Sequence, residues 1–325
     1  MKIKEFRNHF NQELISVFPQ TEIDTFFFLL IEKELGLKRI DLALNNQLAI
    51  PEEKFKHLYN SLSRLKTQEP IQYIIGETEF FGLPLKVTKD TLIPRPETEE
   101  LVEWILTEVA RLQSSKVAEF NTDESFRTEK RSEKSLSILD VGTGTGCIAI
   151  SLAKNLPNAS ITAIDISSEA IKIAKQNADL NDVKIDFIEQ DILKTKSLNV
   201  ISYKTKQSQN RSKIAASKTP RNDIKFDIIV SNPPYVRELE KAEIKPNVLE
   251  NEPHVALFVS DEDPLIFYSK IAELAKNHLS ENGVLYFEIN QYLGKETVDM
   301  LAEKGYETEL KKDIFGNNRM TKSSL

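Results

Sequence analysis

The chain has 325 residues, which suggests about two domains, and its 40% hydrophobic content is enough for a sizeable core. Its 43 Lys or Arg and 50 Asp or Glu give a formal net charge of −7, which argues against a protein that mainly grips a nucleic-acid backbone. The single Cys147 excludes an internal disulfide, and the four scattered histidines have no metal-ligand spacing, so no metal is expected. The apolar runs are too short to cross a bilayer and no signal segment is evident, so we expect a soluble, cytoplasmic protein without a membrane contact.

Residues 1–70 are predicted to form a small helical domain. Apolar residues such as Leu14 and Phe18 recur at helical spacing, and Pro51 fits the start of a later helix. Nothing in this segment has the pattern of a catalytic site.

A β-hairpin linker is expected over residues 71–94. Two short apolar runs, at 73–76 and 85–87, flank a stretch that is rich in turn residues. A second, larger domain is then expected over residues 95–325.

This last domain alternates between short apolar strands and amphipathic helices. The expected strands are 137–141, 160–165, 184–188, 226–230 and 283–288. The expected helices are 96–109, 147–154, 168–179 and 264–279. The alternation is typical of an α/β fold in which helices cover both faces of a parallel sheet.

Two polar segments, at about 113–135 and 196–222, interrupt the alternation. The second holds seven Lys or Arg and no acid, so the rest of the chain would carry a net charge of −14. Neither segment can bury enough apolar surface to offset the entropy of ordering, and both are expected to be flexible surface insertions. A basic insertion can contact RNA, but a solvated loop is the preferred interpretation.

A glycine-rich loop follows the first expected strand and consists of Gly142, Thr143, Gly144, Thr145 and Gly146. Glycines let the backbone approach a ligand at the carboxyl edge of an α/β sheet, where such folds bind ligands. The dinucleotide pattern G-x-G-x-x-G would place a glycine at position 147, where Cys147 stands. The loop therefore predicts a nucleotide-type ligand, and Cys147 is better explained by packing than as a nucleophile.

An acidic residue ends the second expected strand, and another follows the third. Asp165 can accept hydrogen bonds from both hydroxyls of a ribose, and capping of the following helix is better served by Ser167 or Ser168. Asp191 can accept a hydrogen bond from an adenine amino group, and Ile192 can pack on the adenine ring.

The stretch Asn232-Pro233-Pro234-Tyr235, which we call the acceptor turn, follows the fourth strand. Its two prolines remove two backbone donors and stiffen the turn. The Asn232 side chain and the Pro233 backbone then present two carbonyl oxygens, and Tyr235 presents a flat aromatic wall. Two acceptors and a ring suit a planar NH₂ group, so these three residues are the predicted catalytic residues, and Pro234 completes the predicted substrate site.

These motifs together resemble the S-adenosylmethionine-dependent methyltransferases that modify planar amino or amide nitrogens. Further stretches are similar to one family among them, the peptide-chain-release-factor glutamine methyltransferases, also called HemK or PrmC. These stretches are 72–76, 80–82, 92–99, 138–140, 252–257 and 315–319. The resemblance extends over about residues 68–320 apart from the two insertions.

The resemblance implies a seven-stranded, Rossmann-like class I methyltransferase sheet with an N-terminal helical domain that recognises the substrate. It also implies methyl transfer from S-adenosyl-L-methionine to the glutamine side-chain amide in the Gly-Gly-Gln loop of class I peptide chain release factors. The product of the cofactor would be S-adenosyl-L-homocysteine. Release factors would be the partners of a monomeric enzyme that binds no nucleic acid stably.

Individual cofactor contacts are implied as well. Residues 142–146 would contact the methionine end of the cofactor and Asp165 its ribose. Asp191 and Ile192 would border the adenine, and Asn232 would also touch the cofactor. The family often has an aromatic residue at the position of Ile192.

On the substrate side, the resemblance implies that residues 232–235 hold the glutamine. Arg95 and Glu97 would order the entrance of the site or, equally well, anchor the linker. Residues 260–263 lack a glycine that is common in the family. The tail after Arg319 is short, and we expect it to curtail the last strand.

Other functions are not excluded by the motifs. A methyltransferase that acts on an exocyclic amino group of a nucleic-acid base would bind the same planar group, although the acidic balance argues against it. A nicotinamide-dependent dehydrogenase on a related fold would leave the Asn232 turn unexplained. A non-catalytic scaffold would need neither the glycine loop nor the acceptor turn.

Overall fold

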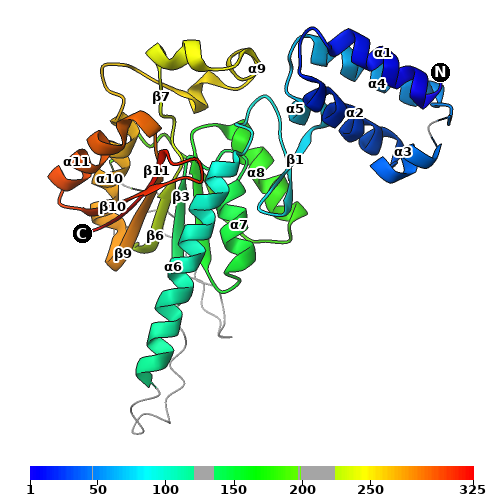
Figure 1. Ribbon diagram of the computed structural model, residues 1–325. Helices are drawn as coiled ribbons and strands as arrows, with labels where there is room; N and C mark the ends of the chain where they lie inside the picture. The colour runs from blue at the N-terminus through cyan, green and yellow to red at the C-terminus, as the bar shows by residue number, and fades with distance from the viewer. Residues whose placement is uncertain (46, 121–134, 197, 199–223) are drawn as a thin grey trace, which may run out of the picture.

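The computed structural model describes residues 1–45, 47–120, 135–196, 198 and 224–325 (Figure 1). Its first segment is helical, with α1 (Ile3–Leu14), α2 (Gln20–Leu35), α3 (Arg39–Asn45) and α4 (Glu52–Lys66). These helices share one apolar core. Phe6, Phe10 and Leu14 lie one helical turn apart on the buried face of α1, as the helical spacing predicts.

The linker begins with a helix where a strand was predicted. Residues Ile71–Ile75 form α5, which starts after Pro70 and ends at Gly76. The hairpin follows as β1 (Glu77–Phe80) and β2 (Leu83–Lys86), and the two turn residues between them both have the positive φ of a two-residue hairpin turn. The prediction of a strand at 73–76 was wrong because a short apolar run does not distinguish one turn of helix from a strand.

The larger domain, residues 95–325, contains a seven-stranded sheet in the order β10-β11-β9-β6-β3-β4-β5. Its strands are β3 (Ser137–Val141), β4 (Ser160–Asp165), β5 (Asp186–Glu189), β6 (Phe226–Ser231), β9 (Leu279–Glu288), β10 (Glu307–Lys312) and β11 (Asn318–Ser324). Strands β5, β4, β3, β6 and β9 are parallel, and β11 is antiparallel to both of its neighbours. The predicted α/β class and the seven-stranded sheet are confirmed.

The last strand is complete, so the prediction that the short tail curtails it was wrong. The residues after Arg319 themselves form most of β11, and Met320 pairs with Glu288 across the ladder to β9. This pairing brings the start of β11 to the carboxyl end of β9.

Helices cover both faces of the sheet (Figure 1). The core on one face includes α6 (Pro96–Phe120), α7 (Cys147–Asn155) and α8 (Ser168–Leu180), and the core on the other includes α10 (Ile266–His278) and α11 (Gly294–Glu303). Side chains of β3 alternate between the two cores, with Ile138 on the first face and Leu139 on the second. Burial on both faces explains why the strands are almost continuously apolar.

The structure corrects part of the prediction for the two insertions. Residues 113–120 continue α6 rather than begin a loop. Residues 121–134, 197 and 199–223 lie outside the described residues, so the prediction that they are flexible is not tested. Leu198 is only 2% exposed and packs in the second core, so the expected surface location is wrong for this residue. Burial of its apolar side chain is favourable even within a polar segment.

Between β6 and α10 the chain crosses the carboxyl edge of the sheet, and we call residues 236–259 the edge segment. Its parts are β7 (Val236–Arg237), η2 (Glu238–Glu243), α9 (Pro246–Leu249), η3 (His254–Ala256) and β8 (Phe258–Val259), and η4 (Gln291–Leu293) precedes α11. Figure 1 shows α9 on the side of the sheet that faces the N-terminal helices. None of the described helices has the length and apolarity that a membrane crossing needs.

Candidate active site

The glycine-rich loop lies between the carboxyl end of β3 and the start of α7. Gly142 and Gly144 have φ of +75° and +55°, which favour glycine, and a Cβ at either position would meet no atom within 4 Å. At Gly146 a Cβ would lie 3.0 Å from Ile150 Cδ1 and 3.2 Å from Ala174 Cβ. The first two glycines therefore leave open space for a ligand, whereas Gly146 allows α7 and α8 to pack closely.

Hydrogen bonds tie this loop to the ends of β3 and β4. The backbone N–H groups of Gly142 and Thr143 donate to Ile164 O at 2.8 and 2.9 Å, and Thr143 Oγ1 donates to Asp140 Oδ2 at 2.6 Å. Asp140 is fully buried, and burial raises the pKa of its carboxyl to about 7. Among the described residues, no group forms a hydrogen bond with its Oδ1.

Asp165 closes one side of the loop. Its Oδ2 accepts a hydrogen bond from Gly144 N at 2.8 Å, and its Oδ1 accepts one from Ser167 N at 2.9 Å. Ser167 caps α8 by accepting a hydrogen bond from Ala170 N, as predicted. Burial raises the pKa of Asp165. A carboxylate offers about four lone pairs, so Asp165 keeps acceptor sites for ligand hydroxyls.

Asp191 and Ile192 follow β5, the next strand in the sheet. Asp191 Oδ2 pairs with Lys194 Nζ at 2.9 Å, and the hydrogen bond from Lys194 lowers the pKa of Asp191. Ile192 is half-buried against the second core. Because Asp165 pairs with Glu189 in the β4–β5 ladder, the predicted cofactor residues lie along one edge of the sheet. An open backbone loop with acids beside it fits a ligand that carries hydroxyl and amino groups.

The acceptor turn begins where β6 ends. Ser231 Oγ donates to Val141 O at 2.6 Å, which holds the turn next to the glycine loop. Asn232 is half-buried, and its Nδ2 donates to Thr98 Oγ1 at 3.2 Å. Its Oδ1 is thereby turned away from Thr98. Pro233 is buried, and Pro234 is half-buried.

Tyr235 is held at both its backbone and its hydroxyl. Its hydroxyl donates to Glu288 Oε1 at 3.1 Å, and its carbonyl accepts a hydrogen bond from Asn290 Nδ2 at 2.9 Å. Its ring is half-buried beside the second core, and burial raises the pKa of the phenol. The structure thus fixes the orientation of the ring, and the role of Tyr235 as an aromatic wall stays a prediction.

Arg95 forms an ion pair with Glu252 of the edge segment. The Arg95 Nη2 donates to Glu252 Oε1 at 2.6 Å, and Ile93 N donates to Glu252 Oε2 at 3.1 Å. The Glu252 side chain is only 1% exposed, so this clamp holds the linker on the edge segment. Glu97 is half-buried and lies close enough to Glu288 to contribute to the raised pKa of that carboxyl.

Two further residues of the site had no assigned role at the sequence level. Thr98 and Glu288 are buried, and Thr98 Oγ1 donates to Glu288 Oε2 at 2.6 Å. Burial raises the pKa of Glu288, although the hydrogen bond from Thr98 and the charge of Arg319 oppose the shift. The available signal for Glu288 was an acid at the carboxyl end of a strand whose preceding residues are apolar. Thr98 lies in the stretch 92–99 that carries the family resemblance, but nothing in the sequence indicated its role.

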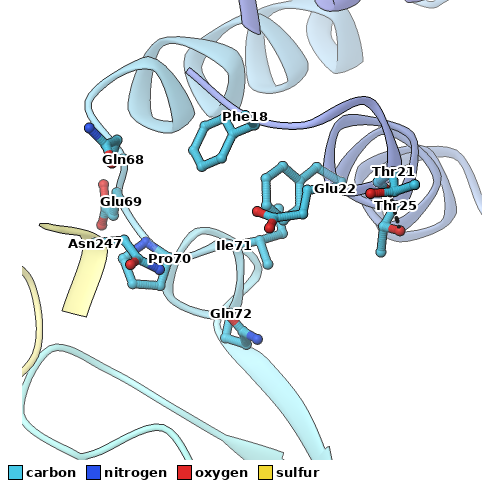
Figure 2. A pocket seen from close by; sticks show the side chains of 11 residues that line it. Phe18, Thr21, Glu22, Thr25, Gln68, Glu69, Pro70, Ile71, Gln72 and Asn247 are labelled. Carbon is cyan, nitrogen blue, oxygen red and sulfur yellow. Dashed lines mark hydrogen bonds between the residues drawn. The ribbon is translucent and has the colours of Figure 1, made fainter. Parts of the chain in front are cut away.

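A cavity of about 400 Å³ lies away from the glycine loop, between the helical domain and the edge segment (Figure 2). Phe18, Glu22 and Pro70 line it from the helical domain, Gln72 from the linker, and Asn247 from α9. Nothing in this lining suits group transfer, so we assign the chemistry to the carboxyl edge of the sheet. Among the residues that the structure describes, no three His, Cys, Asp or Glu side chains gather as a metal site would require.

Comparisons with known proteins agree with this geometry. Residues 132–320 match a family model described as a methyltransferase domain, and residues 7–76 match one described as a PrmC N-terminal domain. The chain is 52% identical to a release factor glutamine methyltransferase of Flavobacterium psychrophilum, with 99% of each chain covered. It is 39% identical to the enzyme of the same name from Bacteroides thetaiotaomicron, with 96% of each chain covered. The chain therefore belongs to the release factor glutamine methyltransferase family, as its motifs predicted.

Proposed function

We propose that this enzyme methylates the side-chain amide nitrogen of the glutamine in the Gly-Gly-Gln loop of class I peptide chain release factors. The observation that carries the proposal is the acceptor turn at Asn232, which the Ser231 hydrogen bond to Val141 O holds beside an open glycine loop. Full-length relatives named for this activity support it.

A methyltransferase domain requires a methyl donor of the S-adenosylmethionine type, and we propose S-adenosyl-L-methionine itself, with S-adenosyl-L-homocysteine as product. When bound, this cofactor supplies an electrophilic methyl group on a sulfonium. Residues 142–146 would hold its methionine end and Asp165 its ribose. Asp191 and Ile192 would border its adenine, and Asn232 would lie at the boundary with the substrate.

The protein must orient a weak nucleophile, because the lone pair of an amide nitrogen is delocalised into the carbonyl. Asn232 Oδ1 and Pro233 O would accept hydrogen bonds from the two N–H groups of the glutamine amide. These two hydrogen bonds would aim the amide nitrogen at the methyl group. Pro233 and Pro234 carry no N–H that would compete for these acceptors. Tyr235 would pack against the face of the amide. Positioning and local electrostatics would then supply most of the acceleration of methyl transfer.

Substrate recognition would involve the rest of the chain. We propose residues 1–70 as the recognition domain, residues 71–94 as the linker and residues 95–325 as the methyltransferase domain. The Arg95 clamp, with Glu97 beside it, would keep the entrance of the site open to the loop of a release factor. The enzyme would act as a cytoplasmic monomer without stable nucleic-acid binding.

A base methyltransferase would use the same two acceptors, but the named relatives do not favour it. To test the proposal, unmethylated release factor is incubated with the enzyme and the labelled cofactor, and its peptides are analysed by mass spectrometry. We expect one methyl group on the loop glutamine and none on a release factor with Gln→Asn at that position. Labelling of nucleic acid in place of the release factor would overturn the proposal.

A further inference from the structure

We propose that Thr98 and Glu288 are positioning residues that fix which end of the Asn232 carboxamide faces the substrate. This inference rests on the proposed function, because it concerns the same acceptor site. It adds two residues to the machinery of the site that hold the acceptor without touching the substrate.

The three side chains come from distant parts of the chain and meet at the carboxyl edge of the sheet. Thr98 lies in the first turn of α6, Asn232 follows β6, and Glu288 ends β9. The hydrogen bond from Asn232 Nδ2 to Thr98 Oγ1 is 3.2 Å long, and the one from Thr98 Oγ1 to Glu288 Oε2 is 2.6 Å long. Thr98 is 2% exposed and Glu288 1% exposed, so bulk water has little access to either.

The direction of these hydrogen bonds is set at Glu288. Its Oε2 accepts the proton of Thr98 Oγ1, and its Oε1 accepts the proton of the Tyr235 hydroxyl. A threonine hydroxyl has a single proton, so once that proton is committed to Glu288 only lone pairs remain for Asn232. Those lone pairs favour the donor end of the carboxamide, Nδ2, and repel the acceptor end, Oδ1.

The two ends of an asparagine carboxamide have nearly the same shape, so packing alone does not choose between them. If the group were flipped, Nδ2 would face the N–H bonds of the substrate, donor against donor, and methyl transfer would lose one of its two acceptors. The carboxylate of Glu288 therefore determines the orientation of Asn232 through Thr98. Glu288 therefore orients Asn232 without contacting it, because Thr98 lies between the two side chains.

Thr98→Val is the most direct test, because valine keeps the shape of the side chain and removes the hydroxyl. We expect kcat/KM for release factor to fall by about ten- to a hundredfold, as for loss of a buried hydrogen bond with a partner left unsatisfied. Affinity for S-adenosylhomocysteine should stay close to the wild-type value, because the glycine loop is unchanged. Thr98→Ser keeps the hydroxyl and should restore most of the activity.

Thr297→Val is the matched control, because Thr297 of α11 is also a buried threonine whose hydroxyl donates to a protein oxygen, Leu293 O, at 2.7 Å. It should retain wild-type kcat/KM. Thr98→Val with near-wild-type turnover, or Thr98→Ser as damaged as Thr98→Val, would overturn the inference. So would an equal loss of turnover in the Thr297 control, since it would show a general effect of removing a buried hydroxyl.

Glu288→Gln probes the other end of the chain of hydrogen bonds, because one of its two terminal atoms becomes a donor. Either Thr98 or Tyr235 must then reverse its hydrogen bond. If both residues act through one chain, the Thr98→Val/Glu288→Gln double variant should be no worse than the poorer single variant. Fully additive losses would contradict the inference.

A measurement that needs no substrate tests this inference independently of the proposed function. The side-chain NH₂ resonances of Asn232, assigned by their loss in Asn232→Ala, should exchange slowly with solvent in the wild type and in Thr98→Ser, and rapidly in Thr98→Val. Equal exchange in all three proteins would overturn the inference. An enzyme that fails to methylate release factor but shows this pattern would overturn the proposed function and leave the positioning role intact.

Discussion

The proposed cofactor side of the site, residues 142–146 and Asp165, and its proposed substrate side, residues 232–235, are held together by different kinds of contact. On the cofactor side, backbone N–H groups bind strand-end oxygens, as Gly142 N does with Ile164 O, and Asp165 contacts Gly144 across only 21 positions. On the substrate side, side chains bind side chains over 134 positions from Asn232 to Thr98 and over 190 positions from Thr98 to Glu288. The first arrangement needs two adjacent βα units, whereas the second needs the whole folded domain.

This difference implies that the two sides can be damaged separately. Asn232→Ala is expected to lower the rate of methyl transfer by about 10³-fold or more, because an acceptor that orients the reacting nitrogen is lost. Its affinity for S-adenosylhomocysteine should stay within about tenfold of the wild type, since the backbone contacts of the glycine loop remain. Titration calorimetry together with single-turnover kinetics would measure both. Near-normal turnover would contradict the assignment.

Asp140 connects the stability of the cofactor side to pH. Its pKa is raised by burial from an ordinary value of 3.8 to about 7, so the folded protein binds the proton more tightly than the unfolded chain does. The stabilisation from this proton is complete below pH 3.8 and is lost as the pH rises through about 7. The expected loss in unfolding free energy across this window is about 4 kcal/mol.

Urea denaturation of the wild type and of Asp140→Asn between pH 4 and 8 would measure this slope. The variant should lack the part of the slope that belongs to Asp140, while the contribution of Glu288, whose pKa burial also raises, cancels in the difference. An identical pH dependence in both proteins would show that Asp140 is ionised in the folded state.

Asp165→Ala should weaken the cofactor side alone. It removes the acceptor for Gly144 N and Ser167 N together with the proposed ribose contact, and we expect an approximately hundredfold loss of cofactor affinity. At saturating cofactor the rate of methyl transfer should be nearly normal. Asp165→Asn keeps one oxygen and should lose less. A variant that binds cofactor normally and turns over slowly would place Asp165 on the substrate side instead.

The glycines should separate ligand binding from stability with the smallest effects. Gly144→Ala adds a Cβ in open space at φ +55°, so we expect a cost of about 1 kcal/mol in unfolding free energy and about a tenfold loss of cofactor affinity. Gly146→Ala adds a Cβ 3.0 Å from Ile150 Cδ1, and overpacking should lower the unfolding free energy further, by about 1–3 kcal/mol. Thermal melts with and without S-adenosylhomocysteine would measure both variants, and equal effects of the two substitutions would contradict the distinction.

Much of the cofactor side could be predicted because its signals lie within single short segments. The glycine loop and the helix cap at Ser167 were placed correctly, and Asp165 lies beside the loop as its position at the carboxyl end of β4 implies. Errors arose where a short segment is compatible with two structures. The apolar residues 73–76 fit a strand as well as the single helical turn that Pro70 and Gly76 enclose. The prediction that the short tail after Arg319 curtails the last strand was wrong because the tail is held by its pairing with β9, which the local sequence does not show.

The amino-acid sequence by itself determined the α/β fold, the glycine loop and the acceptor turn at Asn232, because φ sign, missing backbone donors and apolar periodicity are properties of neighbouring residues. Only the tertiary structure decided that Arg95 pairs with Glu252 and that Thr98 joins Asn232 to Glu288. These partners lie far apart in the chain, and whether two such side chains meet depends on how helices and strands pack. The local sequence therefore identifies Asn232 as the acceptor, whereas the tertiary structure determines the orientation of its side chain.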